Sequence, residues 1–395
     1  MKKVWQTKQL GELCEIELGK TPARANASFW DEKRETSNVW LSIADLLKAE
    51  DNIVADSKEY VSDKGAAICK LVPKGTLLVS FKLTLGRLAF AGRDLFTNEA
   101  IAALTIFNDR ELSKEFLFYC LTFFDWVKAA ENDVKLKGMT LNKAKLKVMP
   151  VPFPPLDEQK RIVAKLDEAF VSLAKAKENA EKNLENARAL FESHLDSVFT
   201  QRGKGRVETT LGQVIEIVGG SQPPKSVFSK TKKVDNIRLI QIRDYKSDKY
   251  VVFIPRNQAR RFCNADDVMI GRYGPPLFQI LRGIEGAYNV ALMKAVPDEA
   301  KLSRDFLFYF LKHSAILQYV IYHSSRAAGQ IGVTKETLEP YPIALPPLVE
   351  QRKVVETIQE LETETQRLTR LYEQKLEALE SLKKSVLHEA FSGNL

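Results

Sequence analysis

Histidine and cysteine, which often act in catalysis and in metal binding, are few and scattered in this 395-residue sequence. The candidates are four histidines and four cysteines: His194, His313, His323, His388, Cys14, Cys69, Cys120 and Cys263. His313 and His323 are ten residues apart, which is a poor spacing for two ligands of one metal. The cysteines form no Cys-x-x-Cys pair, which argues against a zinc site and a disulfide framework and favours a reducing compartment.

The common enzyme motifs are also missing from the sequence. It has no Gly-x-x-x-x-Gly-Lys-[Ser/Thr] phosphate loop, no Gly-x-Gly-x-x-Gly fingerprint and no Gly-x-Ser-x-Gly elbow. Gly274-Pro275-Pro276-Leu277 is not the Asn/Asp-Pro-Pro-Tyr/Phe motif of methyltransferases, because its first position lacks a side-chain amide or acid. We find no carboxylate–lysine cluster of the endonuclease type. The sequence therefore predicts a protein that is not itself an enzyme, with no bound cofactor and no metal.

Net charge is distributed unevenly along the chain. The total is +8, yet residues 156–201 hold 7 basic and 9 acidic residues, and residues 348–395 again hold 7 and 9. Because these two segments carry −2 each, the remaining residues carry +12. Basic globular segments favour a polyanionic partner, and nucleic acid is preferred over a membrane surface. The alternative interpretation is that this charge only keeps the protein soluble.

The sequence contains a long internal repeat. Pro154-Pro155-Leu156-Asp157-Glu158-Gln159 returns 192 residues later as Pro346-Pro347-Leu348-Val349-Glu350-Gln351. The same offset holds without a gap to Phe199 and Phe391, and 14 of the 46 aligned pairs are identical. The chain is therefore a duplication, and two variable globular units indicate a ligand with two parts.

Each repeat predicts a long amphipathic helix. After each Pro-Pro pair, apolar residues recur at steps of three and four with no internal proline or glycine, to Val198 in one copy and Ala390 in the other. A helix over residues 156–199 would be about 66 Å long, too long for one small domain to bury its stripe. We expect the two helices to pair as an antiparallel coiled coil with a pseudo-two-fold axis. The alternatives are that each helix packs on its own domain or on separate partner proteins.

The segments before the helices also correspond to each other. Leu10-Gly11-Glu12 resembles Leu211-Gly212-Gln213, and Phe116-Leu117-Phe118-Tyr119 recurs as Phe306-Leu307-Phe308-Tyr309. Strands are predicted at residues 75–81, 100–107, 237–242, 250–254 and 287–296, and helices at residues 114–124 and 304–322. The predicted class is α+β with a mixed or antiparallel sheet. The predicted parts are a globular domain 1–153, a helix 154–202, a globular domain 203–345 and a helix 346–395.

The order of globular unit, Pro-Pro-Leu-x-Glu-Gln and long helix, given twice, resembles the DNA-specificity subunit of Type I restriction-modification systems. The openings Leu10-Gly11-Glu12 and Leu211-Gly212-Gln213 and the C-terminal residues 387–395 fit this family too. The resemblance covers the whole chain, and the duplication of the motif before paired helices makes it specific.

The resemblance implies a division of labour. Each globular unit would be a target-recognition domain reading one half of a bipartite, asymmetric site in double-stranded DNA. The helices would set the gap between the half-sites and dock two modification (methyltransferase) subunits, which restriction subunits would join. S-adenosylmethionine and ATP would be bound by those partners, and this chain would contribute to DNA modification and to defence against foreign DNA without catalysing a step.

Candidate DNA-binding residues follow from the chemistry of recognition. Arg, Lys, Asn and Gln read base edges, whereas Lys, Arg, Ser and Thr grip phosphates. In the first domain the candidates are Lys20, Thr21, Arg24, Lys82, Thr84, Arg87, Lys135 and Lys137. In the second domain they are Ser221, Gln222, Lys225, Arg243, Arg272, Tyr273, Gln279, Arg326 and Gln330. Lys82, Arg87, Arg272 and Arg326 are preferred because they lie in loops rich in glycine and small polar residues. The alternative for each candidate is a solvated surface residue, and for Tyr273 it is packing.

Three other functions are compatible with the sequence. The chain could be a stand-alone DNA-binding regulator, a coiled-coil scaffold whose ends bind proteins, or the specificity module of a related phage-defence methyltransferase. The concentration of positive charge in the globular segments disfavours the scaffold. The N-terminus leads to no signal-peptide core and no apolar run approaches membrane-spanning length, so we expect a soluble, cytoplasmic protein with no membrane partner.

Overall fold

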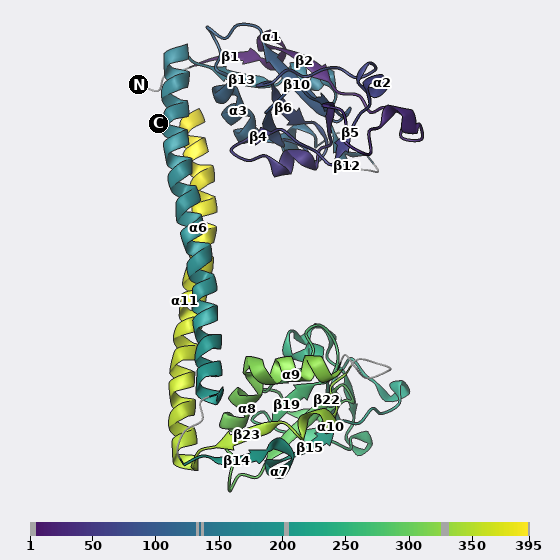
Figure 1. The fold of residues 1–395 in the computed structure, drawn as a ribbon, viewed down its shortest axis with the longest axis vertical. Helices are drawn as coiled ribbons and strands as arrows, with labels where there is room; N and C mark the ends of the chain where they lie inside the picture. The colour runs from purple at the N-terminus through teal and green to yellow at the C-terminus, as the bar shows by residue number, and fades with distance from the viewer. Residues whose placement is uncertain (1–4, 132–133, 136–137, 201–204, 325–331, 394–395) are drawn as a thin grey trace. The chain divides into compact units, whose positions relative to one another are not determined.

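The computed structural model describes residues 5–131, 134–135, 138–200, 205–324 and 332–393. The chain divides into two compact units (Figure 1). The first comprises Met1–Asn179 and Lys375–Leu395, and the second comprises Ala180–Gln374. Each unit contains one globular domain, called domain 1 or domain 2 below, and a piece of both long helices. Among the described residues, no helix is both long enough and apolar enough to cross a membrane.

Domain 1 is built on a five-stranded sheet. In spatial order its strands are β2 (Cys14–Leu18), β10 (Ile101–Ile106), β6 (Leu77–Ser80), β8 (Leu88–Ala91) and β4 (Ile53–Val54). All neighbours are antiparallel except β4 and β8. Helix α3 (Lys114–Phe123) contributes Phe116 and Leu117 to the same core as Leu77 and Leu104.

Smaller elements complete domain 1. A second sheet has the order β5 (Glu59–Tyr60), β3 (Val39–Leu41) and β9 (Phe96–Thr97). A third joins β11 (Val134–Lys135), β12 (Gly138–Thr140) and β7 (Lys82–Leu83), and β1 (Gln6–Gln9) pairs with β13 (Pro150–Phe153). Short helices are α1 (Leu10–Leu13), α2 (Asp63–Ala66), α4 (Trp126–Ala129) and α5 (Lys143–Lys147).

Domain 2 repeats this plan. Its main sheet has the order β15 (Ile215–Gly219), β22 (Leu292–Pro297), β19 (Val268–Gly271) and β20 (Gln279–Leu281). A second sheet joins β17 (Phe253–Pro255), β16 (Asn236–Ile240), β21 (Gly286–Tyr288) and β18 (Phe262–Cys263), and β14 (Val207–Thr210) pairs with β23 (Pro342–Leu345). The helices are α7 (Leu211–Val214), α8 (Arg304–Lys312), α9 (Ser314–Ser324) and α10 (Lys335–Leu338). The predicted α+β class with a mixed or antiparallel sheet is confirmed, and most of the described strand pairs are antiparallel.

The long helices are α6 (Leu156–Thr200) and α11 (Leu348–Phe391). In the first unit, Ile162 and Leu166 near the start of α6 share one core with Leu387 and Ala390 at the end of α11. In the second unit, Leu195 near the end of α6 shares a core with residues at the start of α11. The start of one helix thus lies with the end of the other in both units, which confirms the antiparallel pairing. Each unit also has an ion pair between the helices, Lys177–Glu380 at 2.9 Å and Arg188–Glu373 at 3.1 Å.

The end of each long helix packs on the domain other than the one that immediately precedes that helix in sequence. Phe391 packs against Phe116 of α3, with ring centroids 5.6 Å apart. The equivalent Phe199 packs against Phe306 of α8 at 5.2 Å. In both units, therefore, the first phenylalanine of the repeated Phe-Leu-Phe-Tyr segment packs against the end of a long helix, as expected of a pseudo-symmetric duplication.

The glutamine of the repeated Pro-Pro-Leu-x-Glu-Gln motif fixes each helix start to its own domain. Gln159 is fully buried; its Oε1 accepts from the Ser113 amide at 2.9 Å, and its Nε2 donates to the carbonyls of Glu111 and Pro154. Gln351 makes the same three bonds, to the Ser303 amide and the carbonyls of Lys301 and Pro346. Since Ser113 and Ser303 cap α3 and α8, the motif couples a long helix to the cap of a domain helix.

The strand predicted at residues 250–254 begins only at Phe253, because Asp248–Tyr250 form a 3-10 helix. Two other predicted elements are each broken into two. The single helix predicted at residues 304–322 breaks at His313 into α8 and α9, because Asp196 of α6 accepts from the Ser314 amide and hydroxyl at 2.8 and 2.6 Å and starts a new helix. The single strand predicted at residues 287–296 breaks into β21 and β22. There the Asn289 side chain turns the chain by accepting from the Ala291 amide at 3.1 Å.

Candidate nucleic-acid interface

Three candidates of domain 1 lie in one loop directly after β2. The Lys20 amide donates to the Thr97 carbonyl at 2.8 Å, which holds the loop against β9. Two tryptophans fasten the same loop: Trp40 Nε1 donates to the Lys20 carbonyl at 3.0 Å, and Trp30 Nε1 donates to the Ala23 carbonyl at 3.3 Å. With its backbone held, the loop leaves Lys20 and Arg24 exposed.

Glu99, which was not predicted as a site residue, interacts with candidate residues from two loops. The Thr21 hydroxyl donates to it, and Lys82 and Arg24 act on it electrostatically. Partial burial raises the pKa of Glu99, but that hydrogen bond and these charges outweigh it and hold the pKa below its usual value. In the sequence, Asn98-Glu99-Ala100 of the first domain corresponds to Asn289-Val290-Ala291 of the second. The substitution of Glu99 by Val290 in the second copy was the signal that could have singled it out.

The second group of domain 1 candidates lies on the hairpin between β6 and β8. The Ser80 hydroxyl closes this hairpin by donating to the Thr84 carbonyl and accepting from the Arg87 amide at 3.0 Å. Thr84 is exposed, and Lys82 Nζ lies 5.2 Å from the centre of the Phe81 ring. Arg87 is half-buried and donates to the Ile43 carbonyl at 3.3 Å, so part of its guanidinium is used inside the domain.

This hairpin offers a matched stability test. A Cβ added to Gly86 would lie 2.4 Å from Cδ1 of Trp126, and the residue has a φ of +74°. Gly274, in the corresponding hairpin of domain 2, has a φ of +96° but no atom within 4 Å of such a Cβ. We expect Gly86→Ala to lower the free energy of unfolding by about 2 to 4 kcal/mol, from strain plus a clash, and Gly274→Ala by about 1 to 2 kcal/mol, from strain alone. Urea unfolding of the two variants checks this, and equal losses would contradict it.

Three candidates of domain 2 surround one surface hollow. Gln222, Lys225 and Arg243 line it together with Gln241, Pro223, Pro224, Phe228 and Val252. The loop that carries Ser221, Gln222 and Lys225 is anchored as in domain 1, because the Ser221 amide donates to the Tyr288 carbonyl at 3.1 Å. Arg243 and Lys225 are exposed, and the Arg243 guanidinium lies 5.3 Å from the centre of the Tyr250 ring.

The remaining described candidates of domain 2 lie on the hairpin between β19 and β20. Arg272 is half-buried and donates to the carbonyls of Val333 at 3.1 Å and Val290 at 3.4 Å, so it braces the backbone. Tyr273 packs closely on Gly332, as the packing alternative expected. Gln279 is half-buried and donates to the Pro276 carbonyl at 3.0 Å. Lys137, Arg326 and Gln330 lie outside the described residues, and only the backbone of Lys135, in β11, is described.

Asp45 and Asp244, equivalent in the two domains, are braces of the scaffold. Asp45 is buried and accepts from the Ser42 amide at 3.0 Å, the Ser42 hydroxyl at 2.7 Å and Lys48 at 2.8 Å. Asp244 accepts from the Gln241 amide at 3.0 Å, and burial raises its pKa. The second domain thus keeps the capping aspartate but not its full set of partners.

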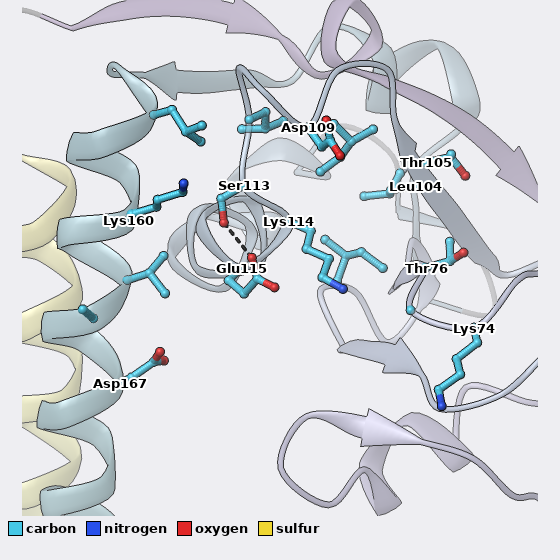
Figure 2. Close-up of a pocket in the computed structure, with 17 residues that line it drawn as sticks. Lys74, Thr76, Leu104, Thr105, Asp109, Ser113, Lys114, Glu115, Lys160 and Asp167 are labelled. Atoms are coloured by element: carbon cyan, nitrogen blue, oxygen red, sulfur yellow. Dashed lines mark hydrogen bonds between the residues drawn. The ribbon is translucent and has the colours of Figure 1, made fainter.

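A hollow of the first unit lies between the sheet, α3 and α6 (Figure 2). Its charged lining is balanced, with Lys74, Lys114 and Lys160 against Asp109, Glu115 and Asp167. In domain 2 the residue matching Lys114 is Arg304, which pairs with Glu299, Asp266 and Asp267. A balanced lining does not favour a polyanion, so this hollow is not part of the candidate interface.

Possible metal ligands and the histidine His313 lie among the described residues. No group of three or more His, Cys, Asp or Glu side chains arranged to hold a metal occurs among the described residues. His313 is buried against Phe199 and Phe310, and burial lowers its pKa. The His313 ring packs the helix end and has no access to a ligand.

Comparison with known proteins gives one family for both halves of the chain. The family model described as Type I restriction modification DNA specificity domain matches residues 2–185 and again residues 204–380. Among curated proteins, the Type I restriction enzyme MjaIX specificity subunit of Methanocaldococcus jannaschii is 24% identical over 261 residues, or 60% of this chain and 58% of that protein. The match thus spans less than two thirds of that relative.

Solved structures share the fold along nearly the whole chain. A chain solved in a study of the assembly and conformational transition of the type I R-M system superposes with a TM-score of 0.77 at 21% identity, covering 100% of this chain and 99% of that one. The HsdS subunit from Thermoanaerobacter tengcongensis gives a TM-score of 0.60 at 19% identity, with 99% and 97% covered.

Proposed function

Because the chain belongs to the Type I restriction modification DNA specificity family, we propose that its two domains each read one half of a bipartite, asymmetric DNA site. The chain provides the sequence specificity of a restriction-modification complex and catalyses neither modification nor cleavage. Those reactions, with S-adenosylmethionine and ATP, belong to partner subunits.

One observation carries the proposal: the two domains share a scaffold and differ in the side chains that it presents. The loop after the first strand of the main sheet is anchored by the same backbone bond in both domains, from Lys20 or Ser221. Yet that loop carries Arg24 in domain 1 and Lys225 in domain 2, and Glu99 is replaced by Val290. Equal scaffolds with unequal side chains are what two readers of different half-sites require.

Charge supports DNA as the ligand. Residues outside the two helical segments carry +12, whereas each helical segment carries −2. Positive charge on the domains favours contacts with phosphates, and nearly neutral helices do not compete for them.

The paired helices suit a second task. We propose that they set the length of the gap between the half-sites and bind two methyltransferase subunits. In each unit the start of one helix lies with the end of the other, so each unit offers a partner an equivalent helical surface. Two copies of one partner need two equivalent docks.

Selection of DNA from a random pool tests this function. The full chain, purified with the modification subunit encoded beside it, is incubated with a library of randomised duplexes, and bound molecules are sequenced. We expect two short defined blocks separated by a gap of fixed length. One continuous block would favour a stand-alone regulator, and no enrichment over the modification subunit alone would contradict the proposal.

A further inference from the structure

One arginine of domain 1 is held in place more completely than a surface residue needs to be. Arg24 points its guanidinium at Glu59 and makes two parallel hydrogen bonds to that carboxylate, one of them 3.2 Å long. Its guanidinium carbon lies 4.1 Å from the centre of the Trp30 ring and 4.7 Å from that of Trp40. These contacts fix both the plane and the direction of the Arg24 guanidinium, although arginine side chains are usually flexible.

The sheet of β5, β3 and β9 positions two of the residues that hold Arg24, namely Trp40 and Glu59. In the pairing of β3 with β5, Trp40 lies directly opposite Glu59. The Trp30 and Trp40 rings meet edge to face, with centroids 5.2 Å apart and planes at 85°. Since both indole N–H groups also bind carbonyls of the Arg24 loop, the same two residues position the loop backbone and the guanidinium.

Glu59 binds the two terminal nitrogens of the guanidinium, Nη1 and Nη2, and not Nε. An arginine has five N–H donors, and a bidentate pair of hydrogen bonds to a carboxylate uses two of them. The remaining three include the parallel pair on the Nε edge, which matches the O6 and N7 acceptors of guanine. The Arg24 side chain is 52% exposed, so a ligand can reach it.

The surrounding charges decide between a base and a phosphate as the partner. Glu59 binds Arg24 directly, and Glu99 lies close enough for Arg24 to lower its pKa. Two carboxylates beside a guanidinium repel a phosphate anion, whereas the edge of a base is neutral and is not repelled. Lys20, which is exposed in the same loop, and Lys82, which acts electrostatically on Glu99, remain suited to the phosphates.

We propose that Arg24 reads a guanine in the half-site of domain 1 and that Glu59 is its positioning residue. This inference rests on the proposed function. It adds a base identity at one position and a role for Glu59. In domain 2 the equivalent residue is Lys225, which lacks the planar fork, so the equivalent position of domain 2 does not read a base in this way.

Conservative substitutions test the inference. In the random-duplex selection described above, the wild-type complex is expected to enrich a guanine at one position of one half-site. Arg24→Lys is expected to lose discrimination for that base by roughly 5- to 150-fold, because lysine keeps the charge and loses the fork. Glu59→Gln is expected to lose less, at the same position only. Arg24→Lys is expected to keep the salt dependence of binding, and both variants are expected to keep the base preferences of the other half-site.

Asp56→Asn provides the matched control. Asp56 accepts from Arg34 at 2.6 Å and from the Tyr60 hydroxyl at 2.7 Å, so it forms a similar arginine–carboxylate pair in the same domain with a different arginine. It is expected to leave base preference unchanged.

The outcomes separate the inference from the function on which it rests. If the wild type selects a split site and Arg24→Lys keeps every base preference, the inference is overturned and the proposed function stands. An equal relaxation in Asp56→Asn would also overturn the inference, because it would reflect general loosening of the domain. If the wild type selects no split site, the proposed function fails and the inference fails with it.

Discussion

Four residues inserted into each long helix are expected to move the two half-sites apart without changing either one. The insertions go after Asn183 and after Lys375, which are equivalent positions of the repeat. Four helical residues add about 6 Å and a net rotation of roughly 40°. One base pair adds about 3.4 Å and roughly 35°. We therefore expect a gap one or two base pairs longer, and loss of modification at the original site.

The gap is measured by sequencing the DNA that the altered complex selects or methylates. Asn183→Ala with Lys375→Ala, without insertion, is the control and should leave gap and half-sites unchanged. An unchanged gap in the insertion variant would show that the helices do not set the spacing. Changed half-sites would show that reading does not reside in the domains alone.

The second large effect concerns the buried glutamine of the repeated motif. Gln159→Leu is expected to lower the free energy of unfolding of the first unit by about 3 to 5 kcal/mol, because it removes three hydrogen bonds and leaves buried backbone groups unpaired. All four tryptophans of the chain lie in the first unit. Their fluorescence therefore reports the unfolding of that unit.

The duplication supplies the matched variant. Gln351→Leu removes the same bonds in the second unit, so it should shift the unfolding transition seen by circular dichroism and not the one seen by tryptophan fluorescence. Asp157→Asn, at an exposed position of the first turn of α6, should change neither transition by more than about 0.5 kcal/mol. A tryptophan transition unchanged by Gln159→Leu would contradict the role given to the motif.

The two long helices and the duplication could be predicted because the sequence shows them directly, as apolar periodicity and as an internal repeat. Steps of three and four fixed the two long helices, and the 192-residue offset fixed the duplication. The pairing of the helices followed from physics, since a stripe of that length needs a partner.

The misses came from contacts between residues distant in sequence. Apolar periodicity continues through His313, and only Asp196, 118 residues before Ser314, explains why a new helix begins there. The site shows the same limit. Arg24 was chosen for its residue type, but Glu59 is 35 residues away and only the strand pairing brings them together. Arg87 and Arg272 were preferred for their glycine-rich loops, yet each spends donors on carbonyls from other segments.

Mapping methylated bases across a genome tests the central claim most directly. The chain is co-expressed with the methyltransferase encoded beside it in a host that lacks both, and a second culture expresses the methyltransferase alone. We predict methylation at a split site with a gap of fixed length, present only when the chain is present. The same methylation without the chain, or none with an active methyltransferase and the chain together, would contradict the assignment of sequence specificity to this protein.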